Sequence, residues 1–299
     1  MTRYIRTAVA ATLCVIATLF TPDLAAQKAE FAVKVCGYTA GNTVATVPAS
    51  VKSIPEMAFA DCSSLKEIRF APGARVASIG ANAFLGCKAL ERIALPSSVL
   101  TLGEGCFREC AALKKLVIPA GVKKLPRFMC EWDEALEEVI LPAGLKDIGS
   151  HAFAYCSSLK KISIPSGVTH IGSNVFSFCT SLREMEIPDS VKELESYAFS
   201  ECTSLERVKL PANPSMLGEL IFSGCRSLEL IREPSTVPPT FDCNSFLFEP
   251  DEAWLYDECS LEVPVGSVNA YREAHGWNLI KKFATAKATN TVNVTGRNS

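Results

Sequence analysis

The segment IPSGVTHIGSNVFSFCTSLREMEI, residues 164–187, contains one complete unit of a pattern that recurs along most of the chain. The preceding segment, residues 141–164, reads LPAGLKDIGSHAFAYCSSLKKISI and matches it at nearly every apolar position. In each unit a Phe is followed three residues later by a Cys, and a Leu comes three residues after that Cys. The Cys recurs mostly at steps of 23 residues, at Cys62, Cys87, Cys110, Cys156, Cys179, Cys202 and Cys225. A fixed period of this length is typical of stacked structural repeats and argues against a globular enzyme with a single cleft.

Each unit predicts one short strand followed by turns. The spacing L-x-x-I-x-I, as in residues 182–187, places alternate side chains on one face of a strand. A Pro follows in most units and ends the strand, because it has no N–H for the parallel ladder. Recurrent glycines before the next turn segment predict tight turns, namely Gly103, Gly149, Gly172 and Gly218. We therefore expect a repeat solenoid whose stacked units share one continuous hydrophobic core.

One unit in the middle of the chain has diverged. One period after Cys110 lies Asp133, and the Phe position before it holds Cys130. The other apolar positions of this unit are kept, including Leu136 and Val139. We expect it to form a complete coil with altered side chains.

These motifs resemble the BspA-like leucine-rich repeat, whose unit reads approximately I-P-x-x-V-x-x-I-G-x-x-A-F-x-x-C-x-S-L-x-x-I-x-I. The resemblance covers about residues 45–283, and residues 260–283 are similar to the closing segment of that family: a last strand, Pro-x-Gly-Ser, and a short amphipathic helix ending in Gly-Trp. It implies a right-handed leucine-rich-repeat superhelix with a parallel β-sheet and short turns or helices in each 23-residue repeat. It also implies a bacterial surface or secreted protein that binds host matrix proteins or other cells.

The chain divides into five segments by composition. Residues 1–26 carry Arg3 and Arg6, an apolar run and a small-residue site, which predicts a secretory signal peptide. We expect an N-terminal cap strand in residues 27–47 and leucine-rich repeats in 48–233. A degenerate last repeat and C-terminal cap are expected in 234–283, and a flexible polar tail in 284–299. The apolar run is too short to predict a stable membrane span, so the protein is expected to be secreted or on the outer face of the cell envelope.

Charge and side-chain chemistry disfavour several functions. Removing residues 1–26 takes away two Arg and one Asp, which changes the net charge from −2 to −3 and disfavours nucleic-acid binding. His151, His170 and His275 have no nucleophile at a recognisable spacing and are interpreted as surface residues. No Cys-x-x-Cys or His/Cys cluster predicts a metal site, and no Gly-rich loop predicts a phosphate or other cofactor. The sequence therefore predicts a protein that is not an enzyme.

The cysteines allow two interpretations. Thirteen Cys in an exported chain would ordinarily predict disulfides. The repeated Cys, however, occupies an inward turn position in every unit, which favours buried free thiols. Cys243 and Cys259 flank an insertion, and a bridge that closes this loop is the alternative there.

The variable outward strand positions are the best candidates for a binding surface. Most of them are polar, but Val117 and Ile140 are apolar and belong to adjacent units. The diverged unit adds Phe128, Met129 and Trp132 at positions that are usually small or polar. We expect a site for a protein partner at these five residues. Alternatively, Trp132 folds back to fill the space left where Cys130 replaces Phe.

The leading functional hypothesis is an exported, non-catalytic protein that binds macromolecular partners at the cell surface. The partners would be host extracellular-matrix proteins or other bacterial surface proteins. The alternative is a structural or assembly module of the bacterial cell envelope without a host ligand. An enzyme with a small site in the insertion 234–259 is the third hypothesis, although that segment contains no His.

Overall fold

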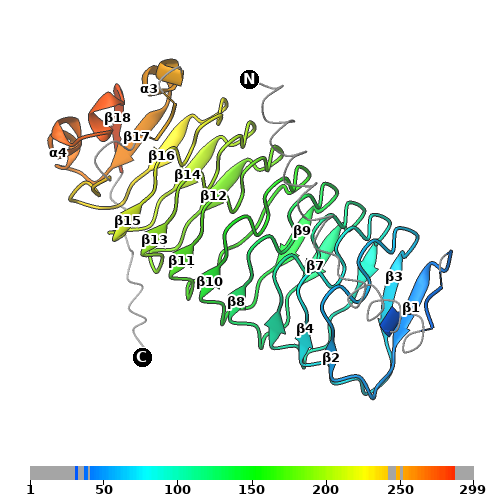
Figure 1. Cartoon of the computed structure of the whole chain (residues 1–299). Coiled ribbons are helices and arrows are strands. Elements are labelled where there is room, and N and C mark those ends of the chain that lie inside the picture. The colour runs from blue at the N-terminus through cyan, green and yellow to red at the C-terminus, as the bar shows by residue number, and fades with distance from the viewer. Residues whose placement is uncertain (1–30, 33–36, 40, 242–246, 250–251, 287–299) are drawn as a thin grey trace, which may run out of the picture.

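The fold is described by a computed structural model that covers residues 31–32, 37–39, 41–241, 247–249 and 252–286. Figure 1 shows an elongated stack of coils, with β1 at one end and the helices α3 and α4 at the other. The predicted solenoid of 23-residue coils with parallel strands is therefore confirmed. The expected signal peptide, residues 1–26, lies outside the described residues.

One strand from nearly every coil contributes to the main parallel sheet. These strands are β1 (Val44–Val47), β3 (Glu67–Phe70), β5 (Arg92–Ile93), β7 (Lys115–Val117), β9 (Glu138–Ile140), β12 (Glu184–Glu186), β14 (Arg207–Lys209), β16 (Leu230–Arg232), β17 (Ser260–Val263) and β18 (Lys282–Thr285). The hydrogen-bonded strands form three separate sets, β1-β3-β5, β7-β9 and β12-β14-β16-β17-β18. An isolated bridge between Glu138 and Lys161 extends the pairing beyond β9. Most strands are only two to four residues long because the Pro after each one cannot extend the ladder.

A second row of short parallel strands runs along the other side of the coils. It consists of β2 (Ser53–Ile54), β4 (Ser78–Ile79), β6 (Thr101–Leu102), β8 (Lys124–Leu125), β10 (Asp147–Ile148), β11 (His170–Ile171), β13 (Glu193–Leu194) and β15 (Met216–Leu217). Equivalent residues pair at the repeat spacing, as in Ile148 with Ile171 and Ile171 with Leu194. Each coil therefore places its side chains directly over those of the coil before it.

The interior is a stack of identical side chains. Leu113, Leu159 and Leu182 are completely buried, as the repeat predicted. The phenylalanines stack face to face, with ring centroids 5.3 Å apart between Phe176 and Phe199 and 5.7 Å apart between Phe153 and Phe176. Contacts of this kind add to the free energy gained from burying each ring.

The repeated thiols are buried and hydrogen-bonded to the backbone. In most coils the Cys Sγ donates to the carbonyl oxygen of the Phe position 26 residues earlier, for example Cys179 to Phe153 at 3.2 Å and Cys202 to Phe176 at 3.1 Å. The thiols of Cys110, Cys156, Cys179, Cys202 and Cys225 are free, as predicted. A small apolar side chain that also satisfies a buried carbonyl explains why Cys recurs at this position.

The recurrent glycines have a different role from the one that the sequence suggested. A Cβ atom on Gly149 would lie 2.8 Å from the backbone nitrogen of Arg127, and one on Gly172 would lie 2.6 Å from that of Ser150. Neither glycine has a positive φ, so turn geometry does not require them. They are needed because adjacent coils approach too closely for a side chain.

A cap closes the C-terminal end. Residues 234–259 form an insertion that lengthens one coil, so that Leu230 pairs with Ser260, 30 residues later. The helix α3 (Ala253–Glu258) lies in this insertion, and β17 is followed by α4 (Val268–Glu273) and a 3-10 helix at Trp277–Leu279. Trp277 is fully buried, which is consistent with the expected closing segment. The last strand reaches Thr285, two residues into the segment that we expected to be the tail.

Candidate partner-binding site

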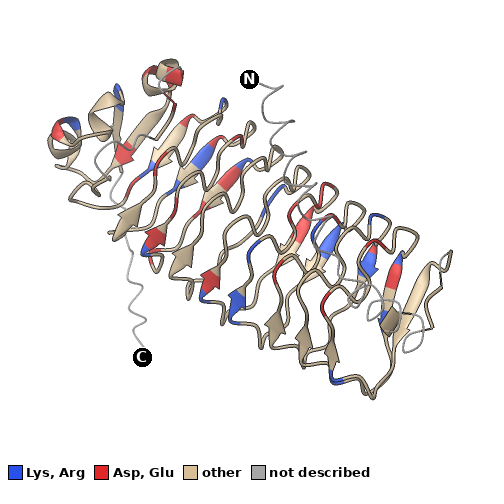
Figure 2. Ribbon diagram, in the orientation of Figure 1, with Lys and Arg blue, Asp and Glu red and all other residues tan. Residues whose placement is uncertain are grey.

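The outward face of the main sheet carries rows of charged side chains that neutralise one another. Acidic and basic residues are interspersed along its strands (Figure 2). The parallel register places opposite charges on neighbouring strands, in the pairs Glu67–Arg92 (3.7 Å), Lys115–Glu138 (2.7 Å) and Glu184–Arg207 (3.3 Å). Such exposed pairs each contribute at most about 1 kcal/mol, so they keep the face soluble more than they stabilise it.

An apolar patch interrupts these charges near the middle of the face. Val117 on β7 and Ile140 on β9 are direct cross-strand partners, and their side chains are 48% and 43% exposed. Ala94 precedes them in the same row and is also exposed. Adjacent exposed aliphatic side chains on a face that is otherwise charged are typical of a contact surface.

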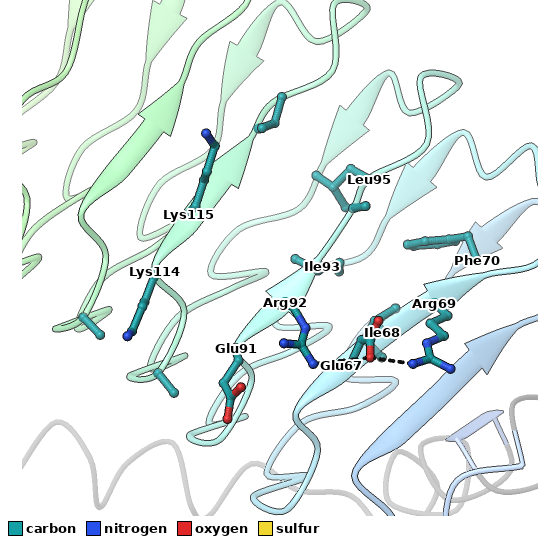
Figure 3. A pocket seen from close by; sticks show the side chains of 14 residues that line it. Glu67, Ile68, Arg69, Phe70, Glu91, Arg92, Ile93, Leu95, Lys114 and Lys115 are labelled. Carbon is teal, nitrogen blue, oxygen red and sulfur yellow. Dashed lines mark hydrogen bonds and ion pairs between the residues drawn. The ribbon is translucent and has the colours of Figure 1, made fainter.

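The patch borders an open groove with a volume of about 1380 Å³ over β3, β5 and β7. Figure 3 shows its charged lining, including Arg92, Lys114 and Lys115, and the hydrogen bond between Arg69 and Glu67. Val117 and the half-buried Leu95 supply apolar lining. A second groove of about 780 Å³ lies further along the same face, between Lys160 and Arg232. Open, mixed grooves of this kind suit an extended macromolecular segment better than a small ligand, which needs a more enclosed site.

The five residues predicted to form one partner site do not lie together. Val117 and Ile140 are on the main sheet, whereas Phe128 and Trp132 are half-buried in the turn segment between β8 and β9. Met129 is completely buried in the core, and its assignment to a binding surface is wrong. It occupies the position that holds Cys106 in the preceding coil and Ala152 in the following one, next to Cys130 at the Phe position, so its larger side chain supplies the volume that Cys130 lacks.

Trp132 does not fill the core. It stands outside the core cluster and stacks on Tyr155, with ring centroids 3.8 Å apart and planes 7° from parallel. Tyr155 stacks in turn on Phe178 at 4.6 Å. We call Trp132, Tyr155 and Phe178 the aromatic strip. Sequence reasoning missed it, although a signal was present, because the three residues are 23 residues apart and each precedes the Cys position.

Phe128 belongs to a compact charged cluster. Its ring lies 5.1 Å from the Arg127 guanidinium, 5.6 Å from that of Arg108 and 5.0 Å from the His151 ring. Arg108 pairs with the buried Glu131 at 2.7 Å. Burial raises the pKa of Glu131, and the nearby Arg108 opposes that shift. Burial and the two arginines lower the pKa of His151, so this histidine is neutral near pH 7.

Two histidines are more buried than a surface role implies. His151 is half-buried in the cluster around Phe128. His170 is also half-buried, between Glu195 (2.9 Å) and Asp147 (3.5 Å). Glu195 additionally accepts hydrogen bonds from the backbone and side chain of Ser173, which lower its pKa against the effect of burial. These contacts join successive coils and are structural.

The remaining chemical groups give no sign of a reactive site in the described part of the chain. Burial raises the pKa of the Cys259 thiol to about 12, which suppresses the reactive thiolate. This thiol is free. Cys243, its partner in the alternative bridge, lies outside the described residues. Among the described residues, no three His, Cys, Asp or Glu side chains are arranged to hold a metal. The helices described here are also too short and too polar to cross a bilayer.

Comparison with known proteins identifies the repeat. A family model for the BspA type leucine rich repeat region matches residues 35–133 and 123–246 in six copies. The chain is similar to a leucine-rich repeat protein from Bacteroides ovatus ATCC 8483, with 22% identity, a TM-score of 0.51, and coverage of 81% of this chain and 72% of that one. It is also similar to a leucine rich cell surface protein from Faecalibacterium prausnitzii A2-165, with 22% identity, a TM-score of 0.42, and coverage of 85% and 82%. No curated protein matches at a significant level.

Proposed function

Because the chain belongs to the family of BspA-type leucine-rich repeat proteins, we propose that it is an exported, non-catalytic protein that binds macromolecular partners at the cell surface. The partners are host extracellular-matrix proteins or surface proteins of other cells. Family membership supports a protein-interaction module, and solenoids of this type are typically non-catalytic. Residues 1–26, with the pattern of a secretory signal peptide, support export.

The observation that carries this proposal is the apolar patch of Val117 and Ile140 beside the groove. Nearly half of each side chain is exposed, and a partner that covers them gains roughly 25 cal/mol for every Å² of apolar surface removed from water. The surrounding charges are already paired across the strands, so they discriminate between partners more than they add affinity. Lys114, exposed at the groove, is placed to meet an acidic side chain.

The test compares two charge insertions. Val117→Asp combined with Ile140→Asp places carboxylates in the patch, and Val237→Asp is the matched control because Val237 is 72% exposed and far along the chain from the patch. Binding to immobilised matrix proteins and to whole cells is measured after circular dichroism has shown that both variants are folded. We expect the double variant to bind at least about tenfold more weakly and the control to bind as the wild type does.

Two results would count against this reading. If neither matrix proteins nor cells retain the wild-type protein, and it instead co-purifies with a component of the producing cell's envelope, the assembly function is correct. If the wild type binds and the double variant binds equally well, the patch is not the contact surface.

A further inference from the structure

The aromatic strip places large rings where the backbone disfavours them. The position that precedes Cys in the repeat has a left-handed conformation, with φ of 68° at Trp132, 62° at Tyr155 and 60° at Phe178. Gly86 and Gly224 occupy the same position in other coils. A bulky residue in this conformation is uncommon and strained. Three consecutive coils keep such residues although their rings lie outside the hydrophobic core, which indicates a role other than packing.

The row that contains the strip has a carboxyl group at each end. Glu109 precedes Trp132 by one coil, and Glu201 follows Phe178 by one coil. Both acidic side chains are half-buried, and neither forms an ion pair in the described part of the chain. Exposed Glu134, two residues after Trp132, adds a third acidic side chain beside the strip. The row therefore combines an aromatic centre with acidic ends, and its charge is complementary to a basic partner.

The basic side chains nearby do not neutralise these carboxyl groups. Arg108 pairs with the buried Glu131 at 2.7 Å. The Arg127 guanidinium lies over the ring of Phe128, 5.1 Å from its centroid. Exposed Lys88 lies one coil beyond the first carboxyl group of the row and forms no ion pair among the described residues.

The other end of the row is also left negative. Burial raises the pKa of Glu201, and although Arg226 opposes this shift, Glu252 adds to it. Burial likewise raises the pKa of Tyr155, and the charges of Glu131 and Glu201 raise it further. The negative charge thus reaches the middle of the strip, where a cation from outside would be stabilised.

The two terminal carboxyl groups are spaced for an extended polypeptide. Glu109 and Glu201 are 92 residues apart, which is four coils of 23 residues. At about 4.8 Å per coil, the two positions are roughly 19 Å apart along the stack. An extended chain rises about 3.3 Å per residue, so its residues i and i+6 cover about 20 Å and project to the same side. The side chains at i+2 and i+4 of such a segment then face the rings.

The strip itself suits an apolar or aromatic side chain. It presents ring edges to solvent, because its ring faces are stacked on one another. Ring edges are electropositive and pair best with the face of another ring. Short side chains lie beside them, among them Ser157 and Thr180, whose hydroxyls bond to backbone carbonyls of the preceding coil. An incoming side chain can therefore reach the edges without displacing a long side chain.

We propose that the aromatic strip and its two terminal carboxyl groups bind an extended segment of a partner protein that has Lys or Arg at positions i and i+6 and apolar or aromatic side chains between them. The two basic side chains pair with Glu109 and Glu201, and the central side chains cover the ring edges around Tyr155. This site lies in the turn segments, apart from the patch of Val117 and Ile140 on the main sheet. It stands whether or not that patch binds a partner.

The test measures the binding of three dye-labelled peptides to the full chain by fluorescence anisotropy at low ionic strength, where charges are least screened. Lys-Thr-Val-Thr-Phe-Thr-Lys has the proposed spacing. Glu-Thr-Val-Thr-Phe-Thr-Glu reverses its charges. Lys-Thr-Val-Thr-Phe-Lys-Thr has the composition of the first peptide, but its second Lys is at i+5 and projects to the opposite side.

The variants remove either the charges or the rings. Glu109→Gln combined with Glu201→Gln removes both terminal charges, and Tyr155→Gly removes the central ring with a residue that this chain already uses at equivalent positions. Glu229→Gln combined with Glu273→Gln is the matched control, because it removes two exposed carboxyl groups elsewhere on the surface. Circular dichroism shows first that each variant is folded, and Phe178→Gly replaces Tyr155→Gly if the latter is not.

We expect the wild type and the control to bind the first peptide at least about tenfold more tightly than either of the other two. Both site variants should raise its dissociation constant more than about tenfold. Glu109→Lys combined with Glu201→Lys should reverse the preference, so that the peptide with two Glu binds more tightly than the one with two Lys. A wild type that does not prefer the first peptide overturns the proposal, as does undiminished binding by the variant without the terminal charges. Equal losses in that variant and in the control would show a general attraction to a negative surface and would also overturn it.

Discussion

Asp133 places a carboxyl group where other coils have a buried thiol, and it should make the protein less stable as the pH rises. Its side chain is completely buried. One carboxyl oxygen accepts a hydrogen bond from the backbone nitrogen of Cys110 at 2.7 Å, whereas the other has no partner among the described residues. Burial raises the pKa of Asp133 well above its usual value, and hydrogen bonding from the Cys110 backbone and the Cys130 side chain only partly opposes the shift.

The magnitude follows from the proton balance. The unfolded chain loses the Asp133 proton near pH 4, and the folded chain keeps it to a higher pH. Unfolding therefore releases a proton between these two pKa values, and the free energy of unfolding falls by about 1.4 kcal/mol per pH unit in that range. Below about pH 4 both states are protonated and this loss is absent.

The change to make is Asp133→Asn, which keeps an oxygen for the Cys110 N–H but cannot ionise. Relative to the wild type, the free energy of unfolding of the variant should increase by about 1.4 kcal/mol for each pH unit above pH 4. The increase should level off at the pKa that Asp133 has in the folded wild type. Asp133→Cys should gain further, because its thiol can donate to the Phe107 carbonyl as the other thiols do. Urea denaturation under reducing conditions, monitored by circular dichroism from pH 4 to pH 8, measures the free energy of unfolding of both variants and of the wild type.

The control is Asp257→Asn, the same chemical change at an exposed position. It measures how much of any effect comes simply from replacing a carboxyl group by an amide at the surface. A constant difference for Asp133→Asn across the series, or one that shrinks as the pH rises, would show that the buried carboxyl group is not held protonated and would refute the reasoning.

Three further outcomes are expected. Burial raises the pKa of Glu233 to about 7. The free energy of unfolding of Glu233→Leu, relative to the wild type, should therefore increase by roughly 3 kcal/mol as the pH rises from about 4.5 to 7, on top of any difference that does not depend on pH. Equal differences between variant and wild type at pH 5 and pH 8, measured by thermal unfolding, would contradict this. Phe176→Ala should cost about 3–5 kcal/mol in urea denaturation, because it opens a cavity between two stacked rings; a loss below 1 kcal/mol would mean that the stack relaxes around it. The repeated thiols should react with a thiol reagent only after denaturant is added, and rapid labelling of Cys179 or Cys202 in the native protein would show that these coils open readily.

Asp133 and Glu233 illustrate what the sequence reveals only in part. Glu233 stands one period after Leu210, which is an aliphatic position in the earlier coils, and Asp133 stands one period after Cys110. Both substitutions are visible in the sequence. Their consequences are not, because the pKa depends on how completely the side chain is buried and on which oxygens find donors.

The sequence by itself determined the solenoid, its 23-residue coil, and the inward positions of leucines such as Leu113, Leu159 and Leu182. In a parallel stack every coil must set equivalent atoms over equivalent atoms, so each inward position repeats and becomes visible in one sequence. Outward positions vary from coil to coil, and the period says nothing of their exposure or partners. Only the tertiary structure placed Met129 in the core, stacked Trp132 on Tyr155 and Phe178, and set Glu252 beside Gly224. These contacts depend on left-handed turn geometry, side-chain rotamers and the close approach of neighbouring coils, which residue types alone do not specify.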